Sequence, residues 1–567
     1  MSDHQANLKN TSLPRPPKPG VEMWVTLAGT SFAALLLVLT AMHAGPLWRD
    51  EVNTLNLAQM SSFQEIWQNL PFESFPPLWP LLLRGWSVLV LANSDAGVRI
   101  LGLLVGLLFL ASLWFCSRWM GSRAPILSVA LLGSLPAFIF IIGASRAYGL
   151  ASCLLVLSFG TLWRVVELPS RSRVFWATLT CLLFAQCVYY DAVFLCAMLV
   201  GAASVVIQRR QWKTLVTLTG IGVVAGMSML IYLPIIHRGS VYVSMNQEPF
   251  SNYSDLWHTL GDALAPRSSA HPPISDSPEI WLWDMLLLGG LVVALAMQRK
   301  LDREKHQPET TAANVVRVRC DLTLFCAVSM LLGIVGFMAF LMKLNYPTQT
   351  WYYVEMLCLC AIALDGLLGA SWPALRPWGL LRIGFMLVVI PWYARSAWEE
   401  AHTRRSNVDL IAVVLNQRVA AGDLIVVQTA WEGITFNRYY HGHAHWVTVP
   451  PIDSHKVHRN DLVVEKMNQL DAMDPVLLEI TNTLHSGNSV WIVGNMAVEH
   501  PRQQPSPPVS QNWRLMPHMN YWSAQVMLLL GEHALQERVL AIPMNGPVSH
   551  LEKLPVVQFS GYKTDAD

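Results

Sequence analysis

Two adjacent carboxylates, Asp50 and Glu51, follow the first long apolar run of this sequence. A carboxylate at a membrane surface can act as a general base for a substrate from water or one carried by a lipid, provided that it reaches the proton it removes. Acidic side chains also stabilise the first turn of a helix, where the helix dipole is positive. The pattern Trp48-Arg49-Asp50-Glu51 therefore predicts either a catalytic base or a helix cap.

Arg146 and Tyr148 lie in a very short polar turn between two later apolar runs. A guanidinium held at the outer interface can donate two parallel hydrogen bonds to a phosphate headgroup. The same side chain can instead extend along the lipid to reach the phosphates of the bilayer. We take Arg146 as a candidate contact for a lipid phosphate, with Tyr148 beside it.

Aromatic and ionisable residues gather at two further outer turns. Asp191 follows two tyrosines, and an acid beside aromatic rings can contact sugar hydroxyls, although an interfacial aromatic belt produces the same pattern. Glu355 falls inside the start of an apolar run, shortly after Lys343 and Tyr352. An ionisable group in a membrane segment is costly and is therefore a functional candidate, with a capped helix start as the alternative. The candidate substrate contacts here are Asp191, Lys343, Tyr352 and Glu355.

Three histidines, His441, His443 and His445, would share one face of a strand, as metal ligands do. No cysteine accompanies them, because none of the nine cysteines lies after Cys360. The cysteines lie in or beside apolar runs without a C-x-x-C pair, which favours a role as small hydrophobic residues. We expect no protein-bound metal and leave a requirement for a divalent cation open.

The composition indicates that a membrane domain holds most of these residues. Of the 567 residues, 53% are hydrophobic and 14% are charged, whereas an average soluble domain is about 25% charged. The net charge of +1 gives no indication of a nucleic-acid partner. About eleven segments have the apolar length of a spanning helix, at 23–42, 98–114, 124–142, 148–163, 174–188, 192–206, 215–236, 281–297, 322–341, 351–368 and 378–392.

Basic residues predict the orientation, because cytoplasmic loops are enriched in Lys and Arg. The first segment is longer than the apolar core of a signal peptide, so it is predicted to be an uncleaved span. With the N-terminus inside, most Lys and Arg of the connecting loops fall in the loops after the second, fourth, sixth and eighth segments, and the C-terminal domain lies outside. The segment 76–91 begins with two prolines and carries Arg84, so it is predicted to lie at the outer interface within a long loop at 44–97.

The composition changes to that of a soluble domain after about residue 407. Buried strands are predicted at 424–428 and 489–493, with helices at 408–420 and 474–485. Strands that alternate with helices favour a small α/β domain. We therefore predict a cytoplasmic tail at 1–22, a transmembrane domain at 23–400 and an extracytoplasmic α/β domain at 401–567.

In their order along the chain, these motifs resemble those of the polyprenyl-phosphate-sugar glycosyltransferases of the C-type fold. That superfamily includes the protein O-mannosyltransferases and the bacterial aminoarabinose transferases of lipid A. Its first outer loop has an Asp-Glu pair and then a Pro-Pro-Leu segment that opens an interfacial helix; an arginine at the second span and an Arg-x-Tyr-x-Leu turn follow. The corresponding residues here are Asp50-Glu51, Pro76-Pro77-Leu78, Val98-Arg99-Ile100 and Arg146-Ala147-Tyr148-Gly149-Leu150.

The resemblance implies a membrane enzyme that transfers a sugar from a polyprenyl phosphate to an acceptor hydroxyl on the extracytoplasmic face, with inversion at the anomeric carbon. Asp50 would be the base, Glu51 would support the site or contact substrate, and Arg146 would lie near the donor phosphate. The lipid-linked sugar would be a substrate rather than a cofactor, and the acceptor a glycan, lipid or protein. The resemblance is closest to bacterial members, which favours the inner membrane.

The chain departs from the family pattern at two places. Phe75 stands before the prolines, where many relatives have Lys, His or Asn, and Thr350-Trp351-Tyr352-Tyr353 stands where many have Arg-Tyr. One alternative is a flippase or transporter for lipid-linked sugars, although transporters place ionisable groups near the bilayer midplane. Another is a non-catalytic subunit that assembles envelope glycans.

Overall fold

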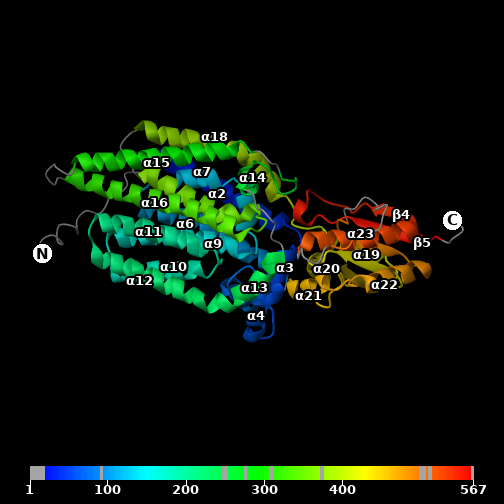
Figure 1. Cartoon of the computed structure of the whole chain (residues 1–567). Helices are drawn as coiled ribbons and strands as arrows, with labels where there is room; N and C mark the ends of the chain where they lie inside the picture. The colour runs from blue at the N-terminus through cyan, green and yellow to red at the C-terminus, as the bar shows by residue number, and fades with distance from the viewer. Residues whose placement is uncertain are drawn as a thin grey trace.

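A computed structural model describes the chain in eight stretches: residues 20–89, 94–245, 253–273, 277–304, 311–370, 376–496, 506–508 and 514–563. Most of the predicted tail at 1–22 lies outside these residues. Long helices lie side by side to form one part of the molecule, and a smaller domain with a sheet caps one end of them (Figure 1). The short helix α3 (Arg49–Ala58) lies where the two parts meet.

Nine helical segments of the described chain are long and apolar enough to cross a membrane. Their outer sides expose large apolar side chains such as Leu104, Val216 and Leu331, a surface that requires lipid rather than water. The segments are α2 (Val21–His43), α6 (Asp95–Trp119), α9 (Ala147–Glu167), α11 (Asp191–Gln208), α12 (Trp212–Met229) continuing through η2 (Leu230–Tyr232) into α13 (Leu233–Met245), α15 (Glu279–Glu304), α16 (Thr311–Leu344), η3 (Thr350–Tyr353) with α17 (Val354–Leu364) and η4 (Asp365–Ala370), and α18 (Arg376–Ala401).

Two of the predicted spans are helical but shorter than the roughly 20 residues of a spanning helix. The segment at 124–142 divides into α7 (Ile126–Leu132) and α8 (Pro136–Ile142), because a proline cannot continue the hydrogen bonds of the preceding helix. The segment at 174–188 is α10 (Arg171–Ala185), which has 15 residues. α7 is buried along its whole length, so it forms part of the core of the bundle.

The first outer loop, predicted at 44–97, is mostly helical. It contains α3, α4 (Phe63–Asn69), η1 (Leu70–Phe72) and α5 (Leu78–Leu89). α5 has 12 residues and exposes Leu81 and Leu82, as expected of an interfacial helix. Arg84 donates hydrogen bonds from α5 to the carbonyls of Ala58 and Met60, which fixes α5 against the end of α3.

The C-terminal domain contains a five-stranded sheet of order β2-β1-β3-β5-β4. β1 pairs in parallel with β2 and β3, and β5 pairs antiparallel with β3 and β4. The predicted strands at 424–428 and 489–493 are the buried central strands β1 and β3, so the α/β prediction is confirmed. The strands are β1 (Leu424–Gln428), β2 (His445–Val449), β3 (Val490–Val493), β4 (Ala534–Leu540) and β5 (Val556–Tyr562).

Helices cover both faces of this sheet. Ile425 and Val427 pack with α19 (Val408–Arg418) on one face. Leu424 and Val426 pack with α22 (Asp474–His485) and α23 (Leu515–His533) on the other, since successive side chains of a strand point to opposite faces. The remaining elements of this domain are α20 (Glu432–Tyr439), α21 (Asn460–Met467) and η5 (His550–Glu552). In the other part of the molecule, α14 (Tyr253–Leu264) lies between α13 and α15 in the chain.

The connection between the two parts is buried and heavily bonded. The Arg405 side chain forms an ion pair of 3.1 Å with Glu400 and donates a hydrogen bond to the carbonyl of Phe140. Burial lowers the pKa of Arg405 to about 10, against the opposing effect of Glu400. The backbone N–H of Arg405 also donates to the carbonyl of Ala44 at the end of α2. These bonds fix the C-terminal domain against the first outer loop.

Candidate active site at the domain junction

The adjacent carboxylates of α3 have different surroundings. Glu51 is fully buried, forms a short ion pair with Arg99, and accepts a hydrogen bond from the backbone N–H of Ser145 at 2.9 Å. It also accepts from the N–H of Trp48 at 3.3 Å, so it caps the first turn of α3. The cap expected as the alternative is thus present for Glu51, and the Asp50 carboxylate is the one that a ligand can reach.

Asp50 has 19% of its side chain exposed and lies among three nitrogen groups. Its carboxylate is 3.7 Å from Arg146 Nη2, 3.7 Å from Arg49 Nε and 3.8 Å from His458 Nε2. Burial acts to raise the pKa of Asp50, but Arg146, His458 and Arg49 outweigh it and hold the pKa below its ordinary value. The side chain is therefore a carboxylate at neutral pH.

A second carboxylate, Glu73, lies behind Asp50 in the same loop. Its side chain is 2% exposed and lies 3.2 Å from Arg146 Nη1. Thr54 Oγ1 and Asn53 Nδ2 donate hydrogen bonds to Glu73 at 2.7 and 3.0 Å. Arg146 also donates to the backbone carbonyl of Asp50 at 2.9 Å. One buried guanidinium therefore joins α3, the loop before α5 and the turn before α9.

Phe75 takes part in the same arrangement. The Arg146 guanidinium lies over the Phe75 ring, 4.4 Å from its centroid, and the ring is fully buried. Tyr148 meets Phe75 edge to face at 5.1 Å. A cation over an aromatic face is stabilised by the ring quadrupole, so the Phe75 ring stabilises the Arg146 guanidinium. Where many members of the family that the sequence resembles have Lys, His or Asn, this chain therefore has an aromatic ring against Arg146.

The C-terminal domain completes the site. The backbone N–H of His458 donates to Asn53 Oδ1 at 2.8 Å, which seats the loop before α21 on α3. Arg49 forms an ion pair of 2.9 Å with Glu432, and its backbone N–H donates to Glu552. Burial raises the pKa of Glu552 to about 8, against the opposing Thr435 hydrogen bond and Arg49 charge. Asp50 therefore faces both parts of the molecule.

Asp191 and Glu355 form a separate and deeper acidic region. Both are fully buried, so Asp191 is not a solvated acid within an interfacial aromatic belt. Asp191 accepts from the backbone N–H of Val188 at 3.0 Å, and Glu355 accepts from the Tyr190 hydroxyl at 3.2 Å. The Tyr190 ring lies 6.5 Å from that of Tyr352. The Glu355 carboxylate is thus bonded to Tyr190, whose ring neighbours that of Tyr352.

The other candidates lie apart from Asp50. Lys343 is exposed in the last turn of α16 and has no ion pair within the described chain. Of the three histidines, only His445 lies in β2, where it is 3.3 Å from Glu479. The described residues contain no group of three His, Cys, Asp or Glu side chains that could hold a metal.

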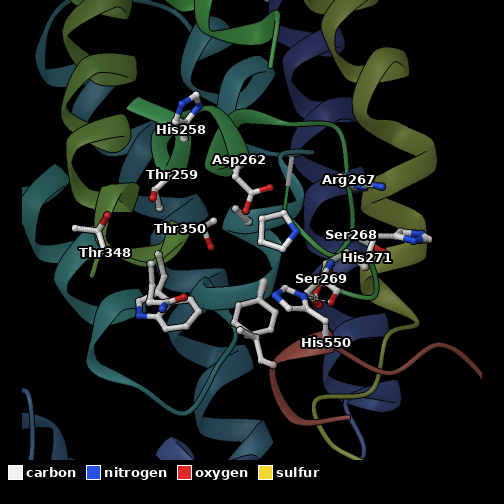
Figure 2. Close-up of a pocket in the computed structure, with 17 residues that line it drawn as sticks. His258, Thr259, Asp262, Arg267, Ser268, Ser269, His271, Thr348, Thr350 and His550 are labelled. Atoms are coloured by element: carbon white, nitrogen blue, oxygen red, sulfur yellow. Dashed lines mark hydrogen bonds between the residues drawn. The ribbon is translucent and has the colours of Figure 1, made fainter. Parts of the chain in front are cut away.

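A polar cavity of about 470 Å³ opens near Asp50, between α14, the segment before η3, α8 and the C-terminal domain (Figure 2). Figure 2 shows the Asp262 carboxylate and the Thr350 hydroxyl near its middle, whereas Arg267 and His271 lie toward α18. Ser268 is 3% exposed and its buried hydroxyl has no hydrogen-bond partner among the described residues. The cavity therefore combines hydroxyl and carboxylate groups with an unused hydrogen-bonding atom.

An aromatic wall of three rings stands between this cavity and the Asp50 helix. Trp351 and Phe140 line the cavity and stack at 6.1 Å. Trp48, two residues before Asp50, meets both rings edge to face at 5.7 and 6.1 Å. The cavity is thus one layer of side chains from α3.

Sequence reasoning missed three residues beside Asp50. Glu73 belongs to no recognisable motif. His458 lies in a loop that docks on α3, and no local sequence pattern indicates this docking. Tyr346 lies between α16 and η3, and burial, followed by the charge of Asp50, raises the pKa of its phenol. The position of Glu73, just before Pro76-Pro77, could have drawn attention to it. Only the fold brings His458 to α3.

No known family profile matches the sequence, and no curated protein matches it. Among solved structures, the chain is similar to ArnT from Cupriavidus metallidurans bound to undecaprenyl phosphate, with 13% identity over 95% of this chain and 98% of that one and a TM-score of 0.47. It is similar also to ArnT from the same organism in the apo state, with 13% identity over 94% and 97% of the chains and a TM-score of 0.38.

Proposed function

We propose that this chain is a membrane glycosyltransferase that transfers a sugar from a polyprenyl-phosphate donor to an acceptor hydroxyl. The reaction takes place on the extracytoplasmic face, with inversion and with Asp50 as the general base. The observation that carries the proposal is a reachable, ionised carboxylate at the boundary between the membrane helices and a soluble domain. A donor held in lipid and an acceptor from the aqueous side can meet at such a boundary.

Two guanidinium groups beside Asp50 support a role in binding phosphate. Arg49 has 30% of its side chain exposed, so a ligand can reach it, and Arg146 lies directly behind. A bound phosphate would offset the positive charge that lowers the pKa of Asp50. The carboxylate then becomes a stronger base when the donor is present, and the same cations stabilise the charge on the leaving phosphate.

The surroundings of the other carboxylates support inversion. A retaining reaction needs a second carboxylate that attacks the anomeric carbon. Glu51 is fully buried in its pair with Arg99, and Glu73 is occupied by Arg146, Thr54 and Asn53. Direct attack by an acceptor hydroxyl, with its proton taken by Asp50, needs neither of them. A product of retained anomeric configuration would contradict this single displacement.

The polar cavity is our candidate site for the acceptor. Its hydroxyl and carboxylate groups can exchange hydrogen bonds with a polyhydroxylated ligand, and the rings of Trp351 and Phe140 provide an apolar side. The cavity is one side-chain layer from α3, so an acceptor that occupies it needs to displace only the aromatic wall to approach Asp50. The acceptor class that fits is a glycan or glycolipid.

The location follows the same reasoning. The first outer loop and the C-terminal domain lie at one end of the helices (Figure 1). Lys and Arg are more frequent in the loops at the other end, which favours a cytoplasmic position for that end. We infer a multi-pass protein of the bacterial inner membrane with its C-terminal domain outside.

The test uses purified protein in lipid with a panel of polyprenyl-phosphate sugars and an envelope extract as acceptor. We expect release of polyprenyl phosphate that depends on the acceptor and is lost in Asp50→Asn. Glu167→Gln is the matched control, because this carboxylate lies at the cytoplasmic end of α9, far from Asp50. Release that survives Asp50→Asn would move the base elsewhere, and transbilayer movement of the donor without release would favour the flippase.

A further inference from the structure

We propose that His458 carries the proton from Asp50 to water, so that a histidine of the C-terminal domain restores the base after each transfer. The inference rests on the proposed function and adds a residue that no motif of the sequence marks. The evidence is the position of the imidazole, the buried state of its Nε2 atom and the charges around it.

The His458 ring is fixed with one nitrogen toward Asp50. Nε2 is 3.8 Å from Asp50 Oδ1, is buried, and has no hydrogen-bond partner in the described part of the chain. The backbone N–H of His458 is bonded to Asn53, and Asn56 donates to the carbonyl of Lys456 at 2.8 Å. Side-chain rotation or one water molecule closes the remaining gap, since catalytic contacts are often long before substrate binds.

The His458 side chain also reaches solvent. It is 19% exposed although its Nε2 is buried, so atoms other than Nε2 make up the exposed part. Imidazole can accept a proton at one nitrogen and release another from the second nitrogen. His458 can therefore pass a proton from Asp50 toward the aqueous side of the domain junction.

The charges around His458 nearly balance. Asp50 and Arg49 face it from α3, Glu73 from the loop before α5, and Arg146 from the turn before α9. In its own loop, the neighbouring Arg459 is paired with Asp461 at 2.6 Å. Burial is the largest influence and lowers the pKa of His458 below its ordinary value, so the imidazole is neutral at neutral pH and can accept a proton.

The proton steps balance as follows. The acceptor oxygen forms a bond to the anomeric carbon and loses its proton to Asp50, while the bond from that carbon to phosphate breaks and its electron pair leaves with the phosphate. Protonated Asp50 then gives the proton to Nε2 of His458. The imidazolium releases its Nδ1 proton to water, which leaves a carboxylate and a neutral ring protonated on Nε2. Exchange with water then returns the ring to the Nδ1–H tautomer before the next transfer. The cations beside Asp50 lower its pKa, which favours release of the proton from the carboxyl group.

The first experiment measures kcat and KM for donor and acceptor in His458→Ala and His458→Gln. We expect kcat to fall about 10- to 100-fold in weak buffer, with both KM values within about 3-fold of wild type, because binding groups remain. Added imidazole should restore most of the kcat of His458→Ala by replacing the lost acceptor. In the wild type, kcat should fall on the acid side as the ring becomes protonated, and this limb should be absent in His458→Gln.

Two control variants test whether the lower kcat of the His458 variants comes only from weaker docking of their loop on α3. Asn56→Ala removes the bond to the carbonyl of Lys456. His455→Gln changes a histidine of the same loop whose ring packs on Trp446, 4.7 Å between centroids. Both should keep the acid limb of the kcat profile. Unchanged kcat in His458→Ala, or a loss that imidazole does not restore, would overturn the relay.

A second measurement does not require turnover. The rate of diethylpyrocarbonate modification of His458, followed by mass spectrometry against pH, reports its apparent pKa. Asp50→Asn removes a negative charge that favours the imidazolium, so the pKa should fall in that variant; an unchanged pKa would overturn the coupling. A clear shift together with no release of polyprenyl phosphate by the wild type would instead contradict the proposed glycosyltransferase and leave the Asp50–His458 pair standing.

Discussion

The Asp50 centre and the polar cavity lie on either side of the aromatic wall and differ in how their polar groups are satisfied. Around Asp50, carboxylates and guanidinium groups neutralise one another within buried networks, and His458 Nε2 has no hydrogen-bond partner among the described residues. In the cavity, hydroxyl groups lie beside charged side chains such as Asp262 and Arg267, and the buried Ser268 hydroxyl has no partner in the described part of the chain. The first arrangement fixes charge in place before reaction, and the second offers hydrogen bonds to an incoming ligand.

This difference suggests a division of labour between the two regions. Fixed charges lower the barrier of a reaction because they need no reorganisation when charge develops. Hydrogen bonds to remote parts of a substrate act mainly on its binding. Changes at the Asp50 centre should therefore act on kcat, and changes in the cavity on KM for the acceptor.

The largest effect on kcat is expected for one of two matched Asp→Asn substitutions. Asp50→Asn should lower kcat about 10³-fold, within the range for loss of a general base. Asp262→Asn, at the cavity, should raise KM for the acceptor and leave kcat within about 3-fold. Steady-state kinetics of the two variants with varied acceptor provides the measurement. A fall in kcat for Asp262→Asn as large as that for Asp50→Asn would remove the distinction between the regions.

Arg146→Gln should have the next largest effect. It leaves Glu73 and Asp50 without their shared cation, and loss of one partner of a buried ion pair costs about 3–5 kcal/mol. We expect lower stability, a kcat reduced about 100-fold and a higher pKa for Asp50. In the His458→Gln background, which lacks the limb due to the imidazole, this should appear as an acid limb of kcat displaced to higher pH. Arg164→Gln is the control, because its pair with Glu167 is partly exposed. An unchanged pH profile would show that Arg146 does not control the charge of Asp50.

The pH dependence of unfolding tests the buried acid where the domains meet. The pKa of Glu552 is raised to about 8 in the folded protein from an ordinary value of 4.5. Its contribution to stability is therefore complete below about 4.5 and is lost as the pH rises toward about 8. Thermal unfolding in lipid should show a midpoint that falls over this range, and less steeply in Glu552→Gln. Glu479→Gln, which changes an exposed acid, should keep the wild-type slope.

The smallest effect is expected from Ser268→Ala in the cavity. The variant removes a hydroxyl without a protein partner, so the thermal midpoint should not fall. KM for the acceptor should rise about 3- to 10-fold if the hydroxyl binds it, in line with about 1 kcal/mol for a neutral hydrogen bond. Ser117→Ala removes a comparable buried hydroxyl in α6 and should leave KM unchanged. Equal KM values in the two variants would argue against acceptor binding in this cavity.

Most of the membrane domain could be predicted from sequence because apolar length is a local property. The predicted strand at 424–428 and helix at 474–485 also coincide with β1 and α22, whose buried positions are continuous or helically spaced. β2, β4 and β5 were not predicted. β4 has five exposed residues between buried ends, as suits an edge strand, so it lacks a strong apolar pattern. The break in the segment at 124–142 depends on a single proline within an apolar run.

The site was predictable to the extent that its residues belong to local motifs. Asp50 and Arg146 were both chosen, and the fold brings them to 3.7 Å although they are far apart in sequence. Their neighbours Glu73 and His458 depend on how a loop and a separate domain dock on α3, which no local periodicity encodes. Glu51, next to Asp50 in the chain, points into the core, since adjacent positions of a helix face different directions.

The dependence of the site on the loop at His458 has a consequence for biosynthesis. Asp50 lies in the part of the chain that the ribosome makes early, whereas His458, Glu432 and Glu552 are made late. A nascent or truncated chain would carry the base without the groups that surround it. Under the proposed function, a donor lipid would therefore meet a complete site only after the final domain has folded onto the helices.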